Sequence, residues 1–305
     1  MIALSDIFLI GTEATTIMWE DLNTKTVELM RGGKLSEAEQ SATEAIASMR
    51  DALPAEDLRL ARALQNLAEI YRAQSRLTES EAFLKESIDI REKVLGRDHP
   101  EVGLVLNNLG GVYFEQGMYR AAEPLFRRAM KLFERALGQN NVQTANSIAN
   151  LAATLRAMEK YPAAKPLYET ALAIKEGVLG KEHLEVGACL NELAGLYDGL
   201  GRHAEAEPLY RRALEVAERN FGPMHPHVAS SLNNLAFCLV GLGEYEDAEA
   251  LLLRAHKILE MNFGESHPIA LEGLNNLIEF FDGAGKPEAA QAAREKARAA
   301  CSCRT

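Results

Sequence analysis

The chain has 305 residues, of which 47% are hydrophobic and 6% aromatic, and its formal net charge is −11. This acidic balance argues against nucleic acid or an anionic membrane as the main partner, because both are bound by basic surfaces. No apolar run reaches the roughly 18 residues that a membrane-spanning helix needs, and the N-terminus lacks the basic start of a signal peptide. We therefore expect a soluble, cytoplasmic protein.

Residues 1–12 lie outside the pattern that fills the rest of the chain. Their apolar side chains fit a short apolar helix or strand: Ile2, Leu4, Ile7, Phe8 and Ile10. We expect this segment to cap the exposed core of the first repeat. Two alternatives are that it docks into the protein's own groove or onto a second copy, and that it is disordered.

From residue 13 onward the chain repeats itself. A Leu-Gly or Phe-Gly step recurs every 42 residues, with its glycine at Gly96, Gly138, Gly180, Gly222 and Gly264. A fixed period of about 20–50 residues indicates a repeat array, in which each unit packs only on its neighbours. The pattern predicts about seven repeats, at residues 13–53, 55–95, 97–137, 139–179, 181–221, 223–263 and 265–300, and then a short tail at 301–305.

Each predicted repeat contains two helices and a tight turn. In the third repeat, Val102, Leu106, Leu109 and Tyr113 follow helical spacing and form one apolar face. The first repeat matches the pattern least well, as expected for a terminal unit with one face in solvent. The predicted turns are at 116–117, 159–160, 200–201 and 242–243. Close packing of the second helices is predicted from alanines that recur in phase: Ala122, Ala164, Ala206 and Ala248, then Ala129, Ala171, Ala213 and Ala255.

The repeat carries the signature of a known family. Leu106-Asn107-Asn108-Leu109 with Tyr113, followed by Gly117, Tyr119 and Ala122-Glu123-Pro124-Leu125-Phe126, resembles the tetratricopeptide repeat (TPR). The similarity is closest to the 42-residue type of kinesin light chains and their prokaryotic relatives. The sequence does not sustain the heptads of a kinesin light chain, so we interpret it as a prokaryotic relative. Over residues 13–300 the resemblance implies an all-α, right-handed superhelix, or α-solenoid, of about seven antiparallel helix pairs with a concave groove.

The resemblance places groove-facing side chains on the first helix of each pair, at the two positions before the signature leucine. Asparagine recurs there although it is a mediocre helix former, and its amide offers donors and an acceptor to the backbone of an extended peptide. The alternative is that each asparagine bridges neighbouring helices and fixes the repeat angle. The candidates are Asn66, Asn107, Asn108, Asn150, Asn191, Asn233, Asn234 and Asn276.

Charged residues of the same helices suggest a direction for the peptide. Arg62, Arg72 and Arg156 lie in the N-terminal half, whereas acidic residues such as Glu192 and Glu279 gather in the C-terminal half. Arginine pairs with carboxylates in a bidentate manner, so we expect a groove graded from basic to acidic. The alternative is a solvated charged face. The lysine pattern with which some TPR proteins bind a C-terminal carboxylate is not matched.

The histidines and cysteines give no indication of a metal site. One slot holds a histidine in four repeats: His99, His183, His225 and His267. Neighbouring repeats stack about 10 Å apart, too far to share a metal with ligands about 2 Å away, so we interpret these histidines as helix starts. Cys301-Ser302-Cys303 has no partner pair. Cys189 and Cys238 are predicted to be buried free thiols, which fits a reducing compartment.

No nucleophile elbow, phosphate-binding loop or paired Glu/His motif is present, and we expect neither catalysis nor a cofactor. Gly110-Gly111, inside a first helix, is interpreted as close helix packing. The predicted function is that of a scaffold or adaptor whose groove binds a protein or extended peptide. Two alternatives are a peptide-sensing regulator gated by its own N-terminus and a self-assembling homo-oligomer.

Overall fold

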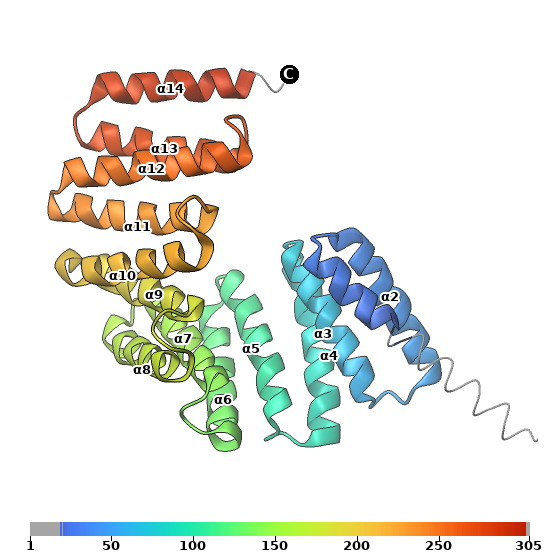
Figure 1. The fold of residues 1–305 in the computed structure, drawn as a ribbon. Coiled ribbons are helices and arrows are strands. Elements are labelled where there is room, and N and C mark those ends of the chain that lie inside the picture. The colour runs from blue at the N-terminus through green and yellow to red at the C-terminus, as the bar shows by residue number, and fades with distance from the viewer. Residues whose placement is uncertain (1–18, 20, 303–305) are drawn as a thin grey trace, which may run out of the picture. The chain divides into compact units, whose positions relative to one another are not determined.

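In the computed structural model the described part of the chain comprises residue 19 and residues 21–302, and all its regular elements are helices (Figure 1). Residues 21–31 are helical. The following helices are α2 (Leu35–Ala52), α3 (Leu58–Ala73), α4 (Leu77–Leu95), α5 (Pro100–Glu115), α6 (Tyr119–Leu137), α7 (Val142–Ala157), α8 (Tyr161–Leu179), α9 (Leu184–Gly199), α10 (His203–Phe221), α11 (Pro226–Leu242), α12 (Tyr245–Phe263), α13 (Pro268–Gly283) and α14 (Pro287–Ser302). The predictions for residues 1–12 fall outside the described residues.

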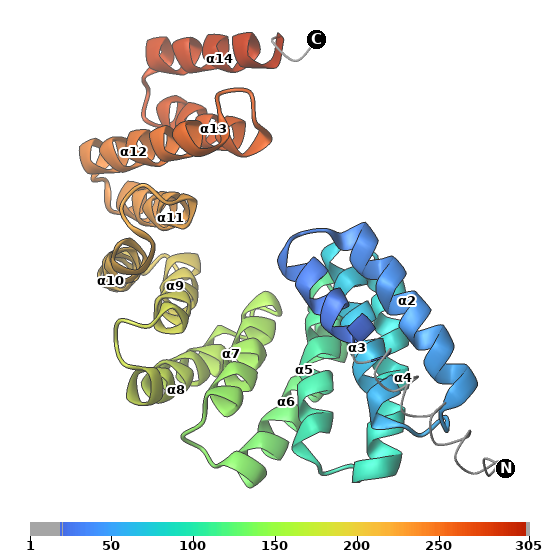
Figure 2. The same cartoon turned by 45° about the vertical axis from the view of Figure 1, so that its right-hand side comes forward.

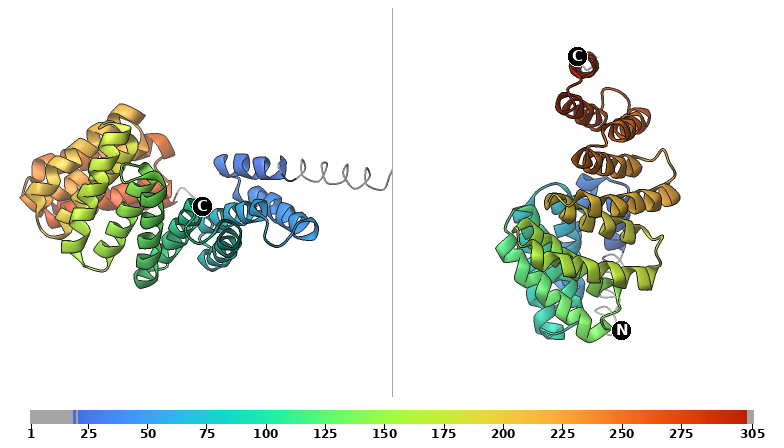
Figure 3. Two further views of the ribbon diagram at one scale, coloured as in Figure 1. Left: turned by 90° about the horizontal axis from the view of Figure 1, so that it is seen from below. Right: turned by 90° about the vertical axis from the view of Figure 1, so that its left-hand side faces the viewer.

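The chain divides into two compact units, the first ending at Glu159 and the second beginning at Lys160. The first unit contains helix 21–31 and α2–α7, and the second contains α8–α14. Within each unit successive helices run antiparallel and pack on the next helix in the chain (Figures 2 and 3). The predicted all-α architecture of helix pairs is therefore confirmed in both units.

The turn inside each pair contains one residue in the left-handed backbone region. Glycine serves at five turns, with φ between 67° and 82°: Gly33, Gly117, Gly201, Gly243 and Gly285. Ser75 and Glu159 adopt the same conformation, with φ of 61° and 60°, although residues with a Cβ rarely do so. The structure thus places a turn at each of the four predicted sites.

The recurring histidines begin the first helices. Nδ1 of His99 accepts a hydrogen bond from the Glu101 backbone N–H at 3.2 Å. His183, His225 and His267 accept in the same way at 3.2–3.3 Å. Where the slot is not histidine, Asp57 and Asn141 accept from the equivalent amides at 2.7 and 2.8 Å. Each side chain satisfies an N–H that the helix cannot pair itself, so the helix-start interpretation is confirmed.

The second helices pack through their small residues. The eight predicted alanines are all at most 1% exposed. In the third repeat the first helix also has a small residue at this contact, namely Gly110. A Cβ added to Gly110 would lie 2.7 Å from the Phe126 ring. The close-packing interpretation of Gly110 is therefore confirmed, and it explains how a bulky phenylalanine fits between α5 and α6.

Two repeats bury a cation at the same position of the second helix. In the first unit, Arg91 donates to the Ala61 carbonyl and to Gln65 Oε1, both at 3.0 Å, and lies 3.5 Å from Glu101. In the second unit, Lys175 pairs with Glu185 at 3.2 Å. Phe133 occupies this position in the repeat between them and is buried too.

The two ends of the described part differ from the regular repeats. Trp19 is buried, and its indole N–H donates to Ser48 Oγ at 3.0 Å, which ties the degenerate first helix to α2. At the other end α14 continues to Ser302, two residues beyond the helix end predicted at residue 300, because its Ala-, Glu- and Arg-rich sequence keeps a high helix propensity. Among the described helices, none has the length and apolar character needed to cross a membrane.

Candidate peptide-binding site

The candidate asparagines lie beside the core on the first helix of each pair. The signature leucines that follow them are at most 4% exposed: Leu67, Leu109, Leu151, Leu193, Leu235 and Leu277. Their position orients the preceding residues toward the rim of the core. Asn150 and Asn234 are exposed, whereas the other six candidates are half-buried.

In the first unit, two of the asparagines reach back to the preceding first helix. Asn66 Nδ2 donates to Asn23 Oδ1 at 2.7 Å. Asn108 Nδ2 donates to Glu69 Oε1 at 3.1 Å. Each bond crosses from one repeat to the next, so these two side chains contribute to repeat spacing, as the structural alternative predicts.

Asn107 reaches forward. Its Nδ2 donates to Ser147 Oγ on α7 at 2.8 Å, while its Oδ1 is buried without a hydrogen-bond partner. Asn150 lies further along α7, and Asn276 lies on α13 of the second unit. The asparagines are therefore not equivalent, although the sequence pattern treats them alike.

The three candidate arginines lie on α3 and α7 in the first unit. Arg72 forms an ion pair with Glu115 of α5, with Nη2 2.5 Å from Oε1. Gly111 leaves room for this guanidinium, since a Cβ added there would lie 3.4 Å from Arg72 Nη2. Arg62 is exposed and Arg156 is half-buried. Glu115 thus neutralises much of the positive charge expected of Arg72.

The second unit contains a pocket of about 250 Å³ formed by α9, α10 and α11. The side chains that α10 contributes are mainly apolar, whereas α9 and α11 add small and polar residues. The lining consists of Leu184, Gly187, Ala188 and Asn191 from α9, Ala213, Val216, Ala217 and Phe221 from α10, and His227, Ser230, Ser231 and Asn234 from α11.

Two candidate asparagines line this pocket. They are Asn191 and Asn234. Asn191 Oδ1 is buried and has no hydrogen-bond partner in the described structure. Asn233, which does not line the pocket, has an Oδ1 in the same state. A buried acceptor left unpaired costs about 1–3 kcal/mol, and the equivalent Asn107 Oδ1 of α5 is buried in the same way. Asn234 is exposed beside the pocket. An apolar surface next to amide groups suits a side chain and the adjoining backbone of a peptide.

The asparagine pattern did not reveal the pocket, because the pocket depends on another repeat position. Ala188 and Ser230 occupy equivalent places one turn before the asparagines, and both line the cavity. Arg62, Leu104 and Glu272 stand at that position in other repeats. The sequence signal that could have indicated the pocket is a small residue at this position in two consecutive repeats.

Cys189 and Cys238 are free and buried, as predicted. Cys189 is 3% exposed, and its thiol donates weakly to the Tyr168 carbonyl at 3.8 Å. Burial raises the pKa of the Cys189 thiol to about 11. This thiol is therefore protonated at neutral pH and is not an activated nucleophile.

Solved structures with the same fold were found among TPR proteins. BtubC (BKLC) from P. vanneervenii is 23% identical over 74% of this chain and 91% of its own, with a TM-score of 0.63. A putative kinesin light chain of P. anserina is 24% identical over 67% and 96%, with a TM-score of 0.59. The apo form of the quorum sensor NprR from B. thuringiensis is 12% identical over 96% and 91%, with a TM-score of 0.62. These likenesses concern the fold alone.

Sequence comparison identifies the family. No curated protein matches the chain significantly. A tetratricopeptide repeat family model, however, matches residues 59–135, 141–219 and 227–302, and a second one matches residues 191–258. The first model covers more than half of the 305 residues. The chain therefore belongs to the tetratricopeptide repeat family.

Proposed function

We propose that this TPR protein is a non-enzymatic adaptor that holds an extended peptide or protein segment against its first helices. The observation that supports the proposal most directly is the pocket between α9 and α11, where Asn191 Oδ1 is buried without a partner. The Asn191 side chain lines this apolar cavity, and an asparagine amide can both donate to and accept from a peptide backbone.

The chemistry of the pocket favours one side chain over a whole small molecule. Its volume of about 250 Å³ is below the range of roughly 300–1,000 Å³ that is typical of small-molecule sites. Ala213, Val216 and Phe221 provide an apolar lining. We therefore propose that an aliphatic or small aromatic side chain enters the pocket while the amides of Asn191 and Asn234 contact the adjoining peptide backbone.

The first unit is proposed to bind more weakly, because its polar side chains already have partners. Asn66, Asn108 and Arg72 are engaged across repeats. Arg62 and Arg72 are both exposed, but Arg72 is held by Glu115. An acidic residue of the ligand would be attracted to Arg62, and the basic end of the proposed charge gradient is therefore smaller than the arginine count suggests.

The experiment is a pull-down from host lysate with the wild-type chain and two matched variants. Ala188→Phe fills the pocket, whereas Leu104→Phe adds bulk at the equivalent exposed position of α5. A partner retained by the wild type and by Leu104→Phe but lost by Ala188→Phe would support the proposal. A partner retained equally by all three would contradict it. The variants must first show helical content and melting temperatures like those of the wild type.

The two alternative functions make different predictions. A sensor gated by its own N-terminus requires residues 1–12 to be protected from hydrogen exchange and released when a peptide binds. A homo-oligomer requires a mass above that of one chain in light scattering. For all three functions we propose a reducing, cytoplasmic location, supported by the free buried thiols of Cys189 and Cys238.

A further inference from the structure

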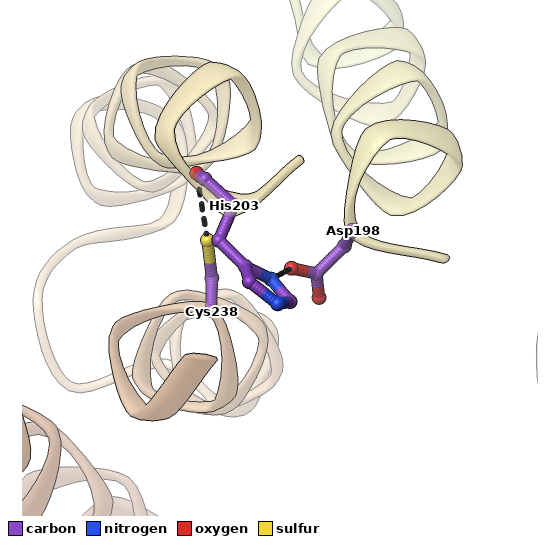
Figure 4. Close-up of side chains that lie close together, drawn as sticks. All are labelled: Asp198, His203 and Cys238. Carbon is purple, nitrogen blue, oxygen red and sulfur yellow. Dashed lines mark hydrogen bonds and ion pairs between the residues drawn. The ribbon is translucent and has the colours of Figure 1, made fainter. Parts of the chain in front are cut away.

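Three side chains with metal-binding chemistry meet in the second unit, where the turn between α9 and α10 lies against α11 (Figure 4). One ligand atom from each of Asp198, His203 and Cys238 lies within 4.8 Å of the other two. His203 Nδ1 is 2.6 Å from Asp198 Oδ1, and the Cys238 thiol donates to the His203 carbonyl at 3.4 Å. His203 thus contacts both of the other residues.

Two of the three residues depart from what the same positions hold in other repeats. His203 stands where Tyr119, Tyr161 and Tyr245 stand elsewhere, and Cys238 where Ile70, Val112 and Leu196 stand. Asp198 replaces Phe114 and Val240 but recurs as Asp282 in the last repeat. The repeat fold itself therefore needs neither the imidazole of His203 nor the thiol of Cys238. Their coincidence at one junction is a second observation, independent of the distances between them.

The surroundings provide space and an appropriate charge. A Cβ added to Gly241 of α11 would lie 2.6 Å from the His203 ring, so the glycine makes room for the imidazole. The carboxylates of Asp198, Glu207 and Glu244 all act electrostatically on the Cys238 thiol. The side chains of Asp198 and His203 are 24% and 29% exposed, whereas Cys238 is buried. A cation can therefore reach the cluster from solvent on its Asp198–His203 side.

We propose that Asp198, His203 and Cys238 form a Zn²⁺ site that fastens the α9–α10 turn to α11. The mixed nitrogen, sulfur and oxygen donors suit zinc, which binds them at about 2.0–2.3 Å in tetrahedral geometry. Binding forms a Zn–S bond and releases the thiol proton to solvent, since a coordinating thiol is deprotonated. Three protein ligands leave the fourth coordination position to water.

The site is tested on the full-length chain carrying Cys301→Ser and Cys303→Ser, which removes the thiols outside the cluster that are near the C-terminus. Cobalt(II) is the probe, because a thiolate ligand gives it a charge-transfer band in the near ultraviolet. We expect a band that saturates at one cobalt per chain and disappears when Zn²⁺ is added. Bound zinc should also raise the melting temperature, because it binds only the folded chain.

The variants take residues that the chain itself uses at equivalent positions. His203→Tyr and Cys238→Val should each weaken metal binding by at least about tenfold, and Cys238→Val should also abolish the charge-transfer band. Cys189→Ser, which copies Ser147 and Ser231, removes the other buried thiol and should leave the band unchanged. Asp198→Asn tests the carboxylate with minimal change of shape.

Two outcomes would overturn the proposal. One is the absence of a charge-transfer band in the parent chain at micromolar cobalt, which would leave the cluster as a hydrogen-bond network between helices. The other is metal binding that survives both His203→Tyr and Asp198→Asn, which would place the metal elsewhere. Thermal melts without metal show whether each variant folds. If Cys238→Val does not fold, His203→Tyr and Asp198→Asn still test the site.

Discussion

The two units use the same repeat differently on their first helices. In the first unit, Asn66 and Asn108 are bonded to the preceding helix, and Arg72 is paired with Glu115. In the second unit, the Oδ1 atoms of Asn191 and Asn233 are buried without partners, and Asn191 lines a pocket. An unpaired Oδ1 recurs at Asn107, the equivalent position of the first unit. The units therefore contrast in the cross-repeat bonds of Asn66 and Asn108 on one side and the pocket-lining Asn191 on the other.

The largest effect on stability is expected at the buried cations, Arg91 in the first unit and Lys175 in the second, because they differ in how many partners they hold. Arg91→Met would leave Gln65 Oε1 without its donor, while the Ala61 carbonyl would keep its hydrogen bond from Ser87 Oγ. Because the lost hydrogen bonds come from a buried charged group, we expect a loss of about 3 kcal/mol in the free energy of unfolding. Lys175→Met would leave only Glu185, which is 40% exposed and can be solvated. We expect that second change to stay within about 1 kcal/mol.

Urea unfolding followed by circular dichroism measures both variants. Arg50→Met is the control, because Arg50 forms an ion pair with Glu86 in which both side chains are at least 39% exposed, and such pairs contribute little. Equal losses for Arg91→Met and Lys175→Met would show that the hydrogen bonds of Arg91 to α3 do not distinguish the two sites.

A smaller effect is expected from paired asparagine deletions. Asn66→Ala with Asn108→Ala removes two cross-repeat hydrogen bonds and should cost about 1–3 kcal/mol in stability. Asn191→Ala with Asn234→Ala removes a buried unpaired acceptor and introduces a better helix former, so stability should be unchanged or slightly higher. The same two proteins compared in the pull-down should show the reverse order, with partner capture lost only in the second.

Thermal melts decide the stability half of this prediction. A comparable loss in both double variants would mean that Asn191 and Asn234 also hold the repeats together, and the peptide-binding proposal would lose its main support.

The sequence predicted the repeats well because packing fixes them. The turns at Gly117 and Gly201, the buried alanines and the histidine helix starts each follow from a local requirement that recurs every 42 residues. The partners of individual side chains are not local. Whether Asn108 meets Glu69, or Asn191 meets a cavity, depends on residues about one repeat away. The Asp198–His203–Cys238 cluster could not be predicted in this way, because its residues lie 5 and 35 positions apart along the chain and meet only through the packing of α11 on the α9–α10 turn.

Acid should destabilise the second unit through His256 of α12. Burial and the ammonium of Lys296, 3.4 Å from Nε2, lower the pKa of His256 below its ordinary value of 6.5, against the weaker opposing pull of Glu260 and Glu265. The folded chain thus favours the neutral ring. Its contribution to stability is complete above pH 6.5 and is lost as the pH falls toward and through the depressed pKa.

The matched variant is His256→Leu, because Leu172 and Leu214 occupy the equivalent position. Between pH 8 and pH 5, roughly the range that spans histidine titration, the melting temperature of the wild type should fall more than that of the variant. Parallel curves would show that protonation of His256 is not coupled to unfolding.

The smallest effect on stability is expected at Arg72 and Glu115, and it bears most directly on the difference between the units. Their side chains are 40% and 38% exposed, so Arg72→Glu should cost about 0.2–1 kcal/mol, and adding Glu115→Arg should restore the loss. The reversed pair keeps the bond but moves its positive charge from α3 to α5. Binding of an acidic peptide that falls several-fold in the single variant and recovers in the double variant would mean that the ion pair organises the surface. Binding that stays low in the double variant would mean that the peptide contacts Arg72 itself, and the first unit would then share the ligand with the second.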